Sequence, residues 1–328
     1  MNDEFPGPRL RIAVIGCGAI SKSHLDAFRG VGLEVTDIAA APNSSRVKIF
    51  SEENMIPNVW TNPMQLINEG DWDGLLITSS IDSTFKLLQQ SIPRNIPILV
   101  EKPVAERSIV LSQLDLNNPK VMVGYNRRFY PAFQEMKKIL EFIGPCMMTV
   151  EIPEVIDNSS RDNPARFKNV RQNSVHVFDL IRFLAGDIEV LSIERIGLNE
   201  KNPGTIAIFR SHIGHLISVT MNYNASSNFK ISIDNGARRY EFNPLEEVSI
   251  YEGLNIQESQ KGQTIRIYKP NLISRGRSDP AENIYKPGFI GQANSFRKMI
   301  LGEEENSHAT LQDALEALKI AEALTPYE

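Results

Sequence analysis

A glycine-rich turn near the N-terminus constrains the fold more than any other feature of the chain. The sequence Ile12-Ala13-Val14-Ile15-Gly16-Cys17-Gly18-Ala19-Ile20-Ser21 joins an apolar strand to the start of a helix. Gly16 permits the tight turn out of the strand, and Gly18, which has no Cβ, lets the backbone approach a pyrophosphate. The start of the following helix offers free N–H groups and the positive end of its dipole. Because a strand precedes the turn and a helix follows it, the sequence predicts a dinucleotide site rather than a glycine turn without a ligand.

Short apolar runs alternate with helix-like segments over the first third of the chain. Near-continuous runs of Val, Ile and Leu are typical of parallel strands that are buried on both faces. Right-handed crossovers between such strands build a doubly wound sheet. We therefore expect a Rossmann domain over residues 1–123. Its six predicted strands cover residues 10–15, 34–41, 59–60, 74–78, 96–100 and 120–123.

The pattern changes after Gly124, and residues 124–328 are expected to form a second α/β domain. Consecutive strands joined by short turns indicate a largely antiparallel sheet. The polar stretch 271–286 is expected to be a loop. The predicted helices cover 131–142, 174–184 and 311–324, and the predicted strands cover 190–196, 205–210, 215–223, 230–233 and 263–268.

Composition limits the class of protein. The 328 residues suit two domains of roughly 150 residues each, and apolar and charged fractions of 41% and 23% are ordinary for a globular chain. A net charge of -5 argues against a non-specific nucleic-acid binder, which would be basic. No apolar run is long enough to span a bilayer, and the first residues are acidic where a secretory signal is basic. We therefore expect a cytoplasmic protein that binds neither membrane nor nucleic acid.

Cys17 and Cys146 are the two cysteines, so neither a disulfide framework nor a metal site is expected.

The end of the second predicted strand bears on the choice of dinucleotide. An NAD-specific site usually has an acid there, which binds the ribose diol, but this position falls near Ala41. Ser44, Ser45 and Arg46 follow, and all three can donate hydrogen bonds to a 2′-phosphate. The cofactor is expected to be NAD or NADP, with a slight preference for NADP. The alternative is that Arg46 is a solvated residue in the first turn of the next helix.

Further segments carry a resemblance to a known family. They are Val100-Glu101-Lys102-Pro103, Gly124-Tyr125-Asn126-Arg127-Arg128-Phe129 and Ser174-Val175-His176-Val177-Phe178-Asp179. Together with the run 311–324, they resemble the Gfo/Idh/MocA family (glucose-fructose oxidoreductase, inositol dehydrogenase and MocA) over residues 10–324. The resemblance implies a Rossmann domain and an α/β domain with an open, largely antiparallel sheet that commonly mediates dimers or tetramers. It also implies NAD(P)-linked hydride transfer at a hydroxyl or carbonyl carbon of a sugar, polyol or nucleotide-linked sugar.

The glycine turn, the strand ends and the resemblance together indicate the cofactor-binding residues. One stretch departs from the family, because Thr78-Ser79-Ser80-Ile81-Asp82-Ser83 stands where a Thr-Pro-Asn segment and a following His are usual. Ser79 and Ser80 can still line the cofactor cleft. The expected residues are Gly16, Cys17, Gly18, Ala19, Ile20, Ser44, Arg46, Thr78, Ser79, Ser80, Glu101 and Lys102.

Two residues are predicted to be catalytic. Lys102 follows the fifth strand at the edge of the sheet where cofactors bind, so its ammonium can hydrogen-bond the reacting oxygen and move its proton. Partial burial and an oxidised nicotinamide would lower the pKa of this lysine. His176 matches the family's histidine, and an imidazole can accept the hydroxyl proton. The alternatives are a surface lysine before a proline and a structural histidine.

Gln172 is the main departure from the family. Many members carry an aspartate four residues before the histidine, whereas this chain has a carboxamide, which can orient a hydroxyl but cannot act as a general base. Three functions therefore stay open. They are an oxidoreductase with a Lys102/His176 pair, a non-catalytic NAD(P)-binding sensor or regulator, and a redox-neutral NAD-dependent glycoside hydrolase.

The residues expected to bind substrate have alternative structural roles. Asp179, one helical turn after His176, either orients the imidazole or caps local structure. A cationic stretch lies before the histidine. It is either a site for a phosphate or carboxylate of the substrate, which would favour a nucleotide sugar, or a solvated loop. Arg127 and Arg128 anchor a ligand or form ion pairs at the domain junction. The stretch contains Arg161, Arg166, Lys168 and Arg171, and the expected substrate-binding residues are Gln172, Asp179, Tyr125, Arg127 and Arg166.

Overall fold

The computed structural model describes residues 9–42, 44–159, 163–197, 203–258, 265–303 and 307–325. These residues divide into two compact units, and each is described by itself. The boundary expected between residues 123 and 124 stays a prediction. The first unit runs to Tyr130 and includes Arg171–Leu180 and Ala281–Glu322, while the second comprises Pro131–Val170, Ile181–Pro280 and the chain from Ala323 onwards.

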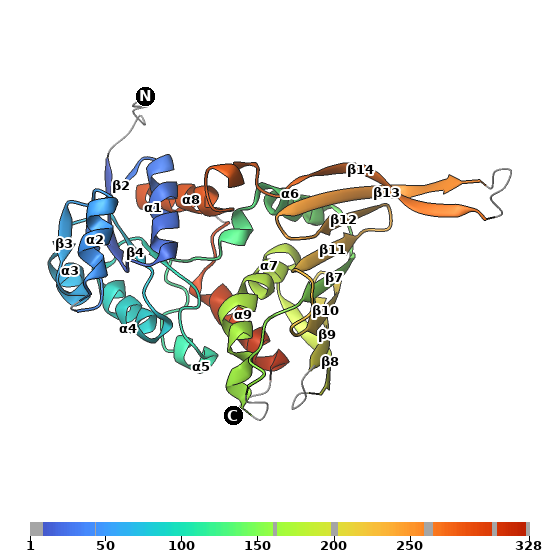
Figure 1. Ribbon diagram of the computed structural model, residues 1–328, viewed down its shortest axis with the longest axis horizontal. Coiled ribbons are helices and arrows are strands. Elements are labelled where there is room, and N and C mark those ends of the chain that lie inside the picture. The colour runs from blue at the N-terminus through green and yellow to red at the C-terminus, as the bar shows by residue number, and fades with distance from the viewer. Residues whose placement is uncertain are drawn as a thin grey trace. The chain divides into compact units, whose positions relative to one another are not determined.

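The first unit is built on a parallel sheet of six strands in the order β3-β2-β1-β4-β5-β6 (Figure 1). All five neighbouring pairs are parallel. The order reverses direction between β1 and β4, which is the switch point where doubly wound sheets bind ligands. The predicted Rossmann sheet is confirmed. The strands are β1 Leu10–Ile15, β2 Leu33–Ala39, β3 Asn58–Trp60, β4 Gly74–Ile77, β5 Ile98–Val100 and β6 Val121–Val123.

Helices cover this sheet and bring distant parts of the chain together. α8 lies beside α1 (Figure 1), and the rings of Phe28 in α1 and Phe296 in α8 stack at 5.8 Å. Both rings are fully buried together with Ile12 and Val14 of β1. This packing explains why β1 is an apolar run, since both faces of the strand are covered. The helices of this unit are α1 Ala19–Gly30, α2 Arg46–Glu53, α3 Pro63–Glu69, α4 Ile81–Ser91, α5 Ser108–Leu111, α8 Phe289–Leu301 and α9 Leu311–Leu324, whose last two residues belong to the second unit.

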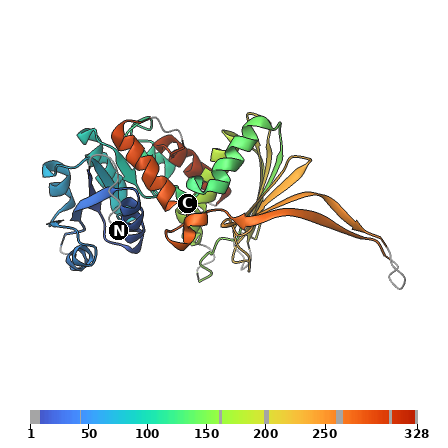
Figure 2. The same cartoon turned by 90° about the horizontal axis from the view of Figure 1, so that it is seen from above.

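The second unit contains an eight-stranded sheet in the order β14-β13-β12-β11-β7-β10-β9-β8. Among the described strands, only β7 and β10 pair in parallel, so the predicted largely antiparallel sheet is confirmed. The helix α6, Pro131–Phe142, lies along one face (Figure 2), where Phe133 stacks on Phe242 of β12 at 4.3 Å. The strands are β7 Met147–Ile152, β8 Ile188–Ile196, β9 Gly204–Ser211, β10 Leu216–Asn222, β11 Lys230–Asp234, β12 Arg238–Phe242, β13 Glu247–Gln257 and β14 Ile267–Arg277.

The loop expected over residues 271–286 is wrong in its first half. β14 continues to Arg277 and pairs with β13 in a long hairpin that extends beyond the other strands (Figure 1). Most side chains of β14 are exposed. A strand that buries neither face has no alternation of apolar and polar residues, and this alternation is the signal that sequence analysis uses. The strand expected at 263–268 lies partly outside the described residues.

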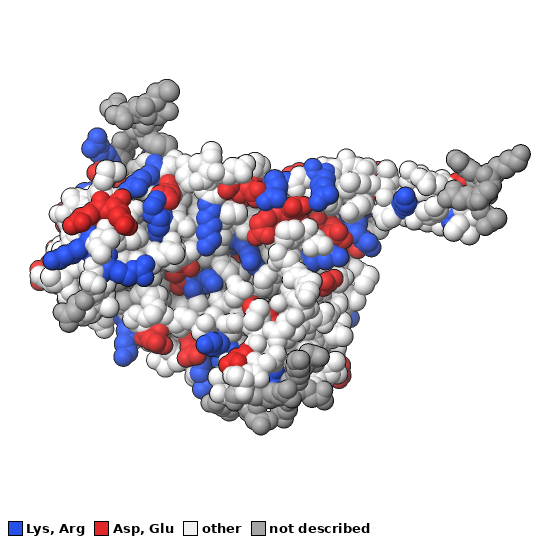
Figure 3. Space-filling view, viewed as in Figure 1, with Lys and Arg blue, Asp and Glu red and all other residues white. Residues whose placement is uncertain are grey.

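The surface and the helices bear on the expected partners. In both units, the Lys and Arg side chains seen in Figure 3 are interspersed with Asp and Glu. Among the residues that the structure describes, no helix combines the length and the apolar character needed to cross a bilayer. The same residues contain no group of three or more His, Cys, Asp and Glu side chains placed to hold a metal ion.

Candidate active site

The glycine turn is built as its sequence requires. Gly16 has a φ of +123°, and a Cβ at this position would lie 2.5 Å from Oγ1 of Thr78 and 2.6 Å from its carbonyl oxygen. Only glycine fits this approach of the turn to the end of β4. Ser21 fixes the start of α1, because its Oγ accepts from the Gly18 amide at 3.1 Å and lies 2.7 Å from Thr78 Oγ1. The third position of the turn is therefore a hydrogen-bonding residue as well as a small one.

A cavity of about 740 Å³ opens beside the turn. This volume is within the range of small-molecule sites. A Cβ at Gly18 would meet no atom within 4 Å, so the glycine leaves space for a ligand to reach the backbone. Eight of the expected cofactor residues line the cavity, namely Gly16, Cys17, Gly18, Ser44, Arg46, Thr78, Ser79 and Ser80. Ala19, Ile20, Glu101 and Lys102 are not among the described residues that line it.

These residues fit a dinucleotide. Helix α1 begins at the glycine turn, and the N-terminal end of a helix offers N–H groups and the positive end of its dipole to a phosphate. At the end of β2 the cavity meets Ala40, Ala41 and Pro42, so the described residues of the lining include no carboxylate at this strand end. Asp37, the acid within β2, is buried and accepts a hydrogen bond from Trp60 Nε1 at 2.7 Å instead.

Sequence analysis missed part of the cavity lining. Asn62 is the N-cap of α3, and its Oδ1 accepts from the Met64 amide at 2.8 Å. The Asn-Pro pair could have indicated this cap, but not its place at a cavity. Asp82 and Lys86 of α4 also line the cavity. Their spacing of four places them on one helix face, which is the only sequence signal they carry.

Lys102 lies two residues past the end of β5 and is half-buried. Its Nζ donates a hydrogen bond to the backbone carbonyl of Gln172 at 2.9 Å. Gln172 belongs to a single π-helical turn, Val170–Ser174, which runs directly into α7, Val175–Ala185. The structure thus brings the predicted lysine to the segment that carries the predicted histidine. It is the carbonyl of Gln172, rather than its carboxamide, that makes this contact.

His176 lies in the first turn of α7 and is 8% exposed. Among the described residues its Nδ1 is buried without a hydrogen-bond partner. The edge of its ring contacts the ring of buried Tyr125, with centroids 5.6 Å apart. Burial, and then the positive charges of Lys102, Arg127 and Lys286, lower the pKa of His176 well below 6.5. The imidazole is therefore neutral near pH 7, and a buried polar atom without a partner is unusual enough to indicate a ligand.

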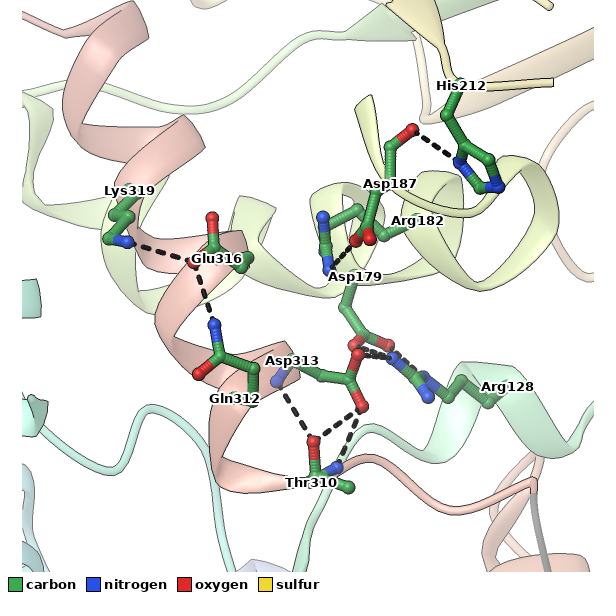
Figure 4. Close-up of polar contacts among 10 residues, drawn as sticks. All are labelled: Arg128, Asp179, Arg182, Asp187, His212, Thr310, Gln312, Asp313, Glu316 and Lys319. Carbon is green, nitrogen blue, oxygen red and sulfur yellow. Dashed lines mark hydrogen bonds and ion pairs between the residues drawn. The ribbon is translucent and has the colours of Figure 1, made fainter. Parts of the chain in front are cut away.

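Asp179 is held by an arginine. Its two oxygens accept from Nε and Nη2 of Arg128 at 2.8 and 2.6 Å, and both side chains are buried. Arg128 Nη2 also lies 3.3 Å from Asp313 of α9, which in turn accepts from the amide and hydroxyl of Thr310 (Figure 4). Burial works against the ionised Asp313, but the charge of Arg128 and these hydrogen bonds lower its pKa. The contacts of Asp179 are thus with Arg128, and its assignment to substrate stays a prediction.

The other predicted substrate residues divide between the two units. Tyr125 is buried, which raises its pKa well above 10, and Arg127 beside it is half-buried in the first unit. Arg166 lies in the second unit, where its Nη2 donates to Asn158 Oδ1 at 2.6 Å and its guanidinium lies over the ring of Phe167. Arg161 lies outside the described residues.

Comparison with known proteins agrees with this geometry. Residues 10–125 match the GFO_IDH_MocA family model, described as an oxidoreductase family with an NAD-binding Rossmann fold. Over these residues the chain is similar to the Gfo/Idh/MocA family. The predicted resemblance is confirmed over this domain, and the matched family is one of NAD-binding oxidoreductases.

Individual relatives extend the likeness beyond this domain. It is 26% identical to inositol 2-dehydrogenase of Corynebacterium glutamicum (strain R) over 244 residues, covering 69% of this chain and 70% of that protein. Two solved structures share the fold of both units over almost the whole chain. UDP-N-acetylglucosamine 3-dehydrogenase GnnA from Acidithiobacillus ferrooxidans has a TM-score of 0.71 at 15% identity and covers 97% of each chain. An oxidoreductase from Agrobacterium radiobacter, in complex with NAD+, L-tartaric acid and magnesium, has a TM-score of 0.70 at 18% identity and covers 96% of this chain and 95% of that one.

Proposed function

We propose that this oxidoreductase transfers a hydride between a nicotinamide and a hydroxyl or carbonyl carbon of a sugar, polyol or nucleotide-linked sugar. The observation that carries the proposal is the contact of Lys102 Nζ with the Gln172 carbonyl at 2.9 Å. This contact holds the ammonium of Lys102 at Gln172, and Gln172 lies four residues before the buried, neutral His176. It does so at the carboxyl end of β5, on the edge of the sheet where such folds bind their ligands.

Lys102 and His176 divide the proton chemistry. A bound nicotinamide supplies or accepts the hydride. In the reducing direction the ammonium of Lys102 donates a proton to the carbonyl oxygen, and in the oxidising direction its neutral amine accepts the proton of the hydroxyl. The unpartnered Nδ1 of His176 accepts a hydrogen bond from a substrate hydroxyl, which a neutral imidazole can do and an imidazolium cannot. The carboxamide of Gln172 orients a second hydroxyl.

The substrate class is supported by what the relatives are named for. One is an inositol 2-dehydrogenase and another is a UDP-N-acetylglucosamine 3-dehydrogenase. The positive charges of Arg127 and Lys286 at His176 suit a substrate with a phosphate or carboxylate, such as a nucleotide sugar. We also propose a homodimer or homotetramer formed through the second sheet, because Ile206 of β9 and Ile196 of β8 are exposed apolar side chains on neighbouring strands.

The proposed cofactor preference is for NADP. Ala41 lines the cavity near the expected position of the ribose acid, and an alanine side chain does not repel a 2′-phosphate. Arg46 and Lys86 both line this cavity, and the charge of either cation would favour such a phosphate. Asp82 lines it as well, and its negative charge favours NAD.

The proposal is tested by incubating the purified protein with NAD+ or NADP+ and one substrate at a time: myo-inositol, UDP-N-acetylglucosamine or L-tartrate. We expect the absorbance of reduced nicotinamide to rise in proportion to product. Lys102→Met should bind cofactor but turn over nothing. Near wild-type turnover in that variant would show that the lysine is not the proton-transfer group. Product without a net absorbance change would instead indicate the redox-neutral hydrolase.

A further inference from the structure

A buried contact between His24 and Glu101 lies outside the proposed proton chemistry. His24 Nε2 is 2.7 Å from Glu101 Oε1, although 77 positions separate the two residues. Both side chains are buried. The second oxygen, Oε2, accepts a hydrogen bond from the backbone amide of Lys102 at 3.1 Å. One carboxylate thus joins helix α1 to the backbone of the lysine.

We propose that His24 and Glu101 are positioning residues that tie the backbone of Lys102 to helix α1, the helix that begins at the dinucleotide turn. The inference rests on the proposed function, because it concerns the lysine that moves the proton. It assigns Glu101 to holding Lys102 rather than to touching the cofactor. Both of its oxygens are engaged within the protein, and the described lining of the cavity does not include it.

Neighbouring residues restrict the positions of both side chains of the pair. The His24 ring packs against Phe289 with centroids 4.7 Å apart and against Phe28 at 5.9 Å. On the other side, a Cβ at Gly124 would lie 3.0 Å from Glu101 Oε1. The glycine therefore leaves room for the carboxylate, and the aromatic rings fix the imidazole that it meets. Because close-packed interiors transmit strain, a shift of His24 would also shift the carboxylate of Glu101.

Helix α1 is fixed at two points on one face. Ser21 joins the glycine turn to Thr78, and His24, three residues later and on the same face, joins the helix to Glu101. Both residues are 0–1% exposed. A ligand on the glycine turn therefore contacts the same helix that holds the carboxylate. This gives a short physical route from the cofactor site to the amide of Lys102.

Competitive labelling of the full chain with trace acetic anhydride tests the proposal without a substrate, because it measures how fast each lysine reacts. His24→Met removes the imidazole, and Glu101→Gln replaces one of the two accepting carboxylate oxygens with an NH2 group, which donates instead. With a net hydrogen bond of about 1 kcal/mol lost, we expect Lys102 to react roughly threefold to tenfold faster in both variants. Exposed Lys48 should keep its rate and serves as the internal control. His24→Gln, whose amide can donate to Oε1, should restore the wild-type rate at Lys102.

A matched variant separates positioning from general stability. His215 is as buried as His24, and its Nδ1 accepts from the Cys146 amide at 3.1 Å in the second unit. His215→Met should lower the melting temperature but leave the labelling of Lys102 unchanged. The proposal is overturned if folded His24→Met and Glu101→Gln proteins label Lys102 at the wild-type rate. It is also overturned if His215→Met raises that rate equally.

A second readout keeps this inference distinguishable from the proposed function. Fluorescence titration of the wild-type protein with NADPH and NADH reports cofactor binding directly. If neither binds, the proposed function fails, whatever the labelling shows. If a cofactor binds and labelling of Lys102 is the same in all variants, the positioning pair fails and the proposed function stands.

Discussion

The guanidinium of Arg128 donates two hydrogen bonds to the carboxylate of Asp179, at 2.8 Å from Nε and 2.6 Å from Nη2. Arg128 is 4% exposed and Asp179 is 1% exposed. Such a fork onto a carboxylate is the strongest geometry that an ion pair adopts in proteins. Because Asp179 lies one helical turn after His176, the pair also fixes the start of α7.

Removing one partner of this pair should be costly. Asp179→Asn removes the closest carboxylate from the buried charge of Arg128, and breaking a buried pair in this way costs about 3 kcal/mol of unfolding free energy. Urea unfolding measures the loss. The control is Asp187→Asn, because Asp187 pairs with Arg182 but its side chain is 80% exposed. That variant should lose at most about 1 kcal/mol. Equal losses in the two variants would contradict a structural role for the Arg128 pair.

Substituting the two glycines of the turn by alanine should have different effects, one on stability and one on cofactor binding. Gly16→Ala introduces a Cβ that overlaps Thr78 and places a non-glycine residue at positive φ, so it should lower the melting temperature. Gly18→Ala meets no protein atom and has a φ of -86°, so the fold should be unaffected. Its methyl group instead faces the cavity and should weaken NADPH binding by about tenfold or more, equivalent to roughly 1.4 kcal/mol. A Gly18→Ala protein with wild-type affinity would show that no ligand approaches the backbone there.

Structural features that are set by neighbouring residues in the sequence can be predicted from it, and features that are set by tertiary packing cannot. The glycine turn and the buried strands of the first sheet were predicted, because a positive φ and a strand covered on both faces each leave a local pattern. The exposed strand β14 leaves no such pattern. The contacts of His24 with Glu101 and of Arg128 with Asp179 join residues 77 and 51 positions apart. Their partners are set by tertiary packing, so composition and spacing could not identify them.

Arg46 should decide how strongly a 2′-phosphate is bound. It is the first residue of α2, is exposed and lines the cavity, so Arg46→Ala should leave the fold intact. Losing a charge-assisted hydrogen bond of about 1.5–3 kcal/mol should weaken NADPH binding by roughly tenfold to a hundredfold. The affinity for NADH should not change. Lys48→Ala, at an exposed residue of the same helix outside the described cavity lining, is the control. Equal weakening of both cofactors by Arg46→Ala would argue against a 2′-phosphate site.

The lowered pKa of His176 should make the protein less stable in acid. Its pKa in the folded protein is well below 6.5, chiefly because of burial, whereas in the unfolded chain it is near 6.5. Between these two values the unfolded state binds more protons, so the unfolding free energy falls as the pH drops below about 6.5. His176→Asn removes this contribution, and its unfolding free energy should vary less between about pH 5 and pH 7. The exposed His212, changed to Asn, should leave the wild-type slope. Urea unfolding across this range measures both slopes, and a His176→Asn protein as pH-sensitive as wild type would mean that the imidazole is not buried in its neutral form.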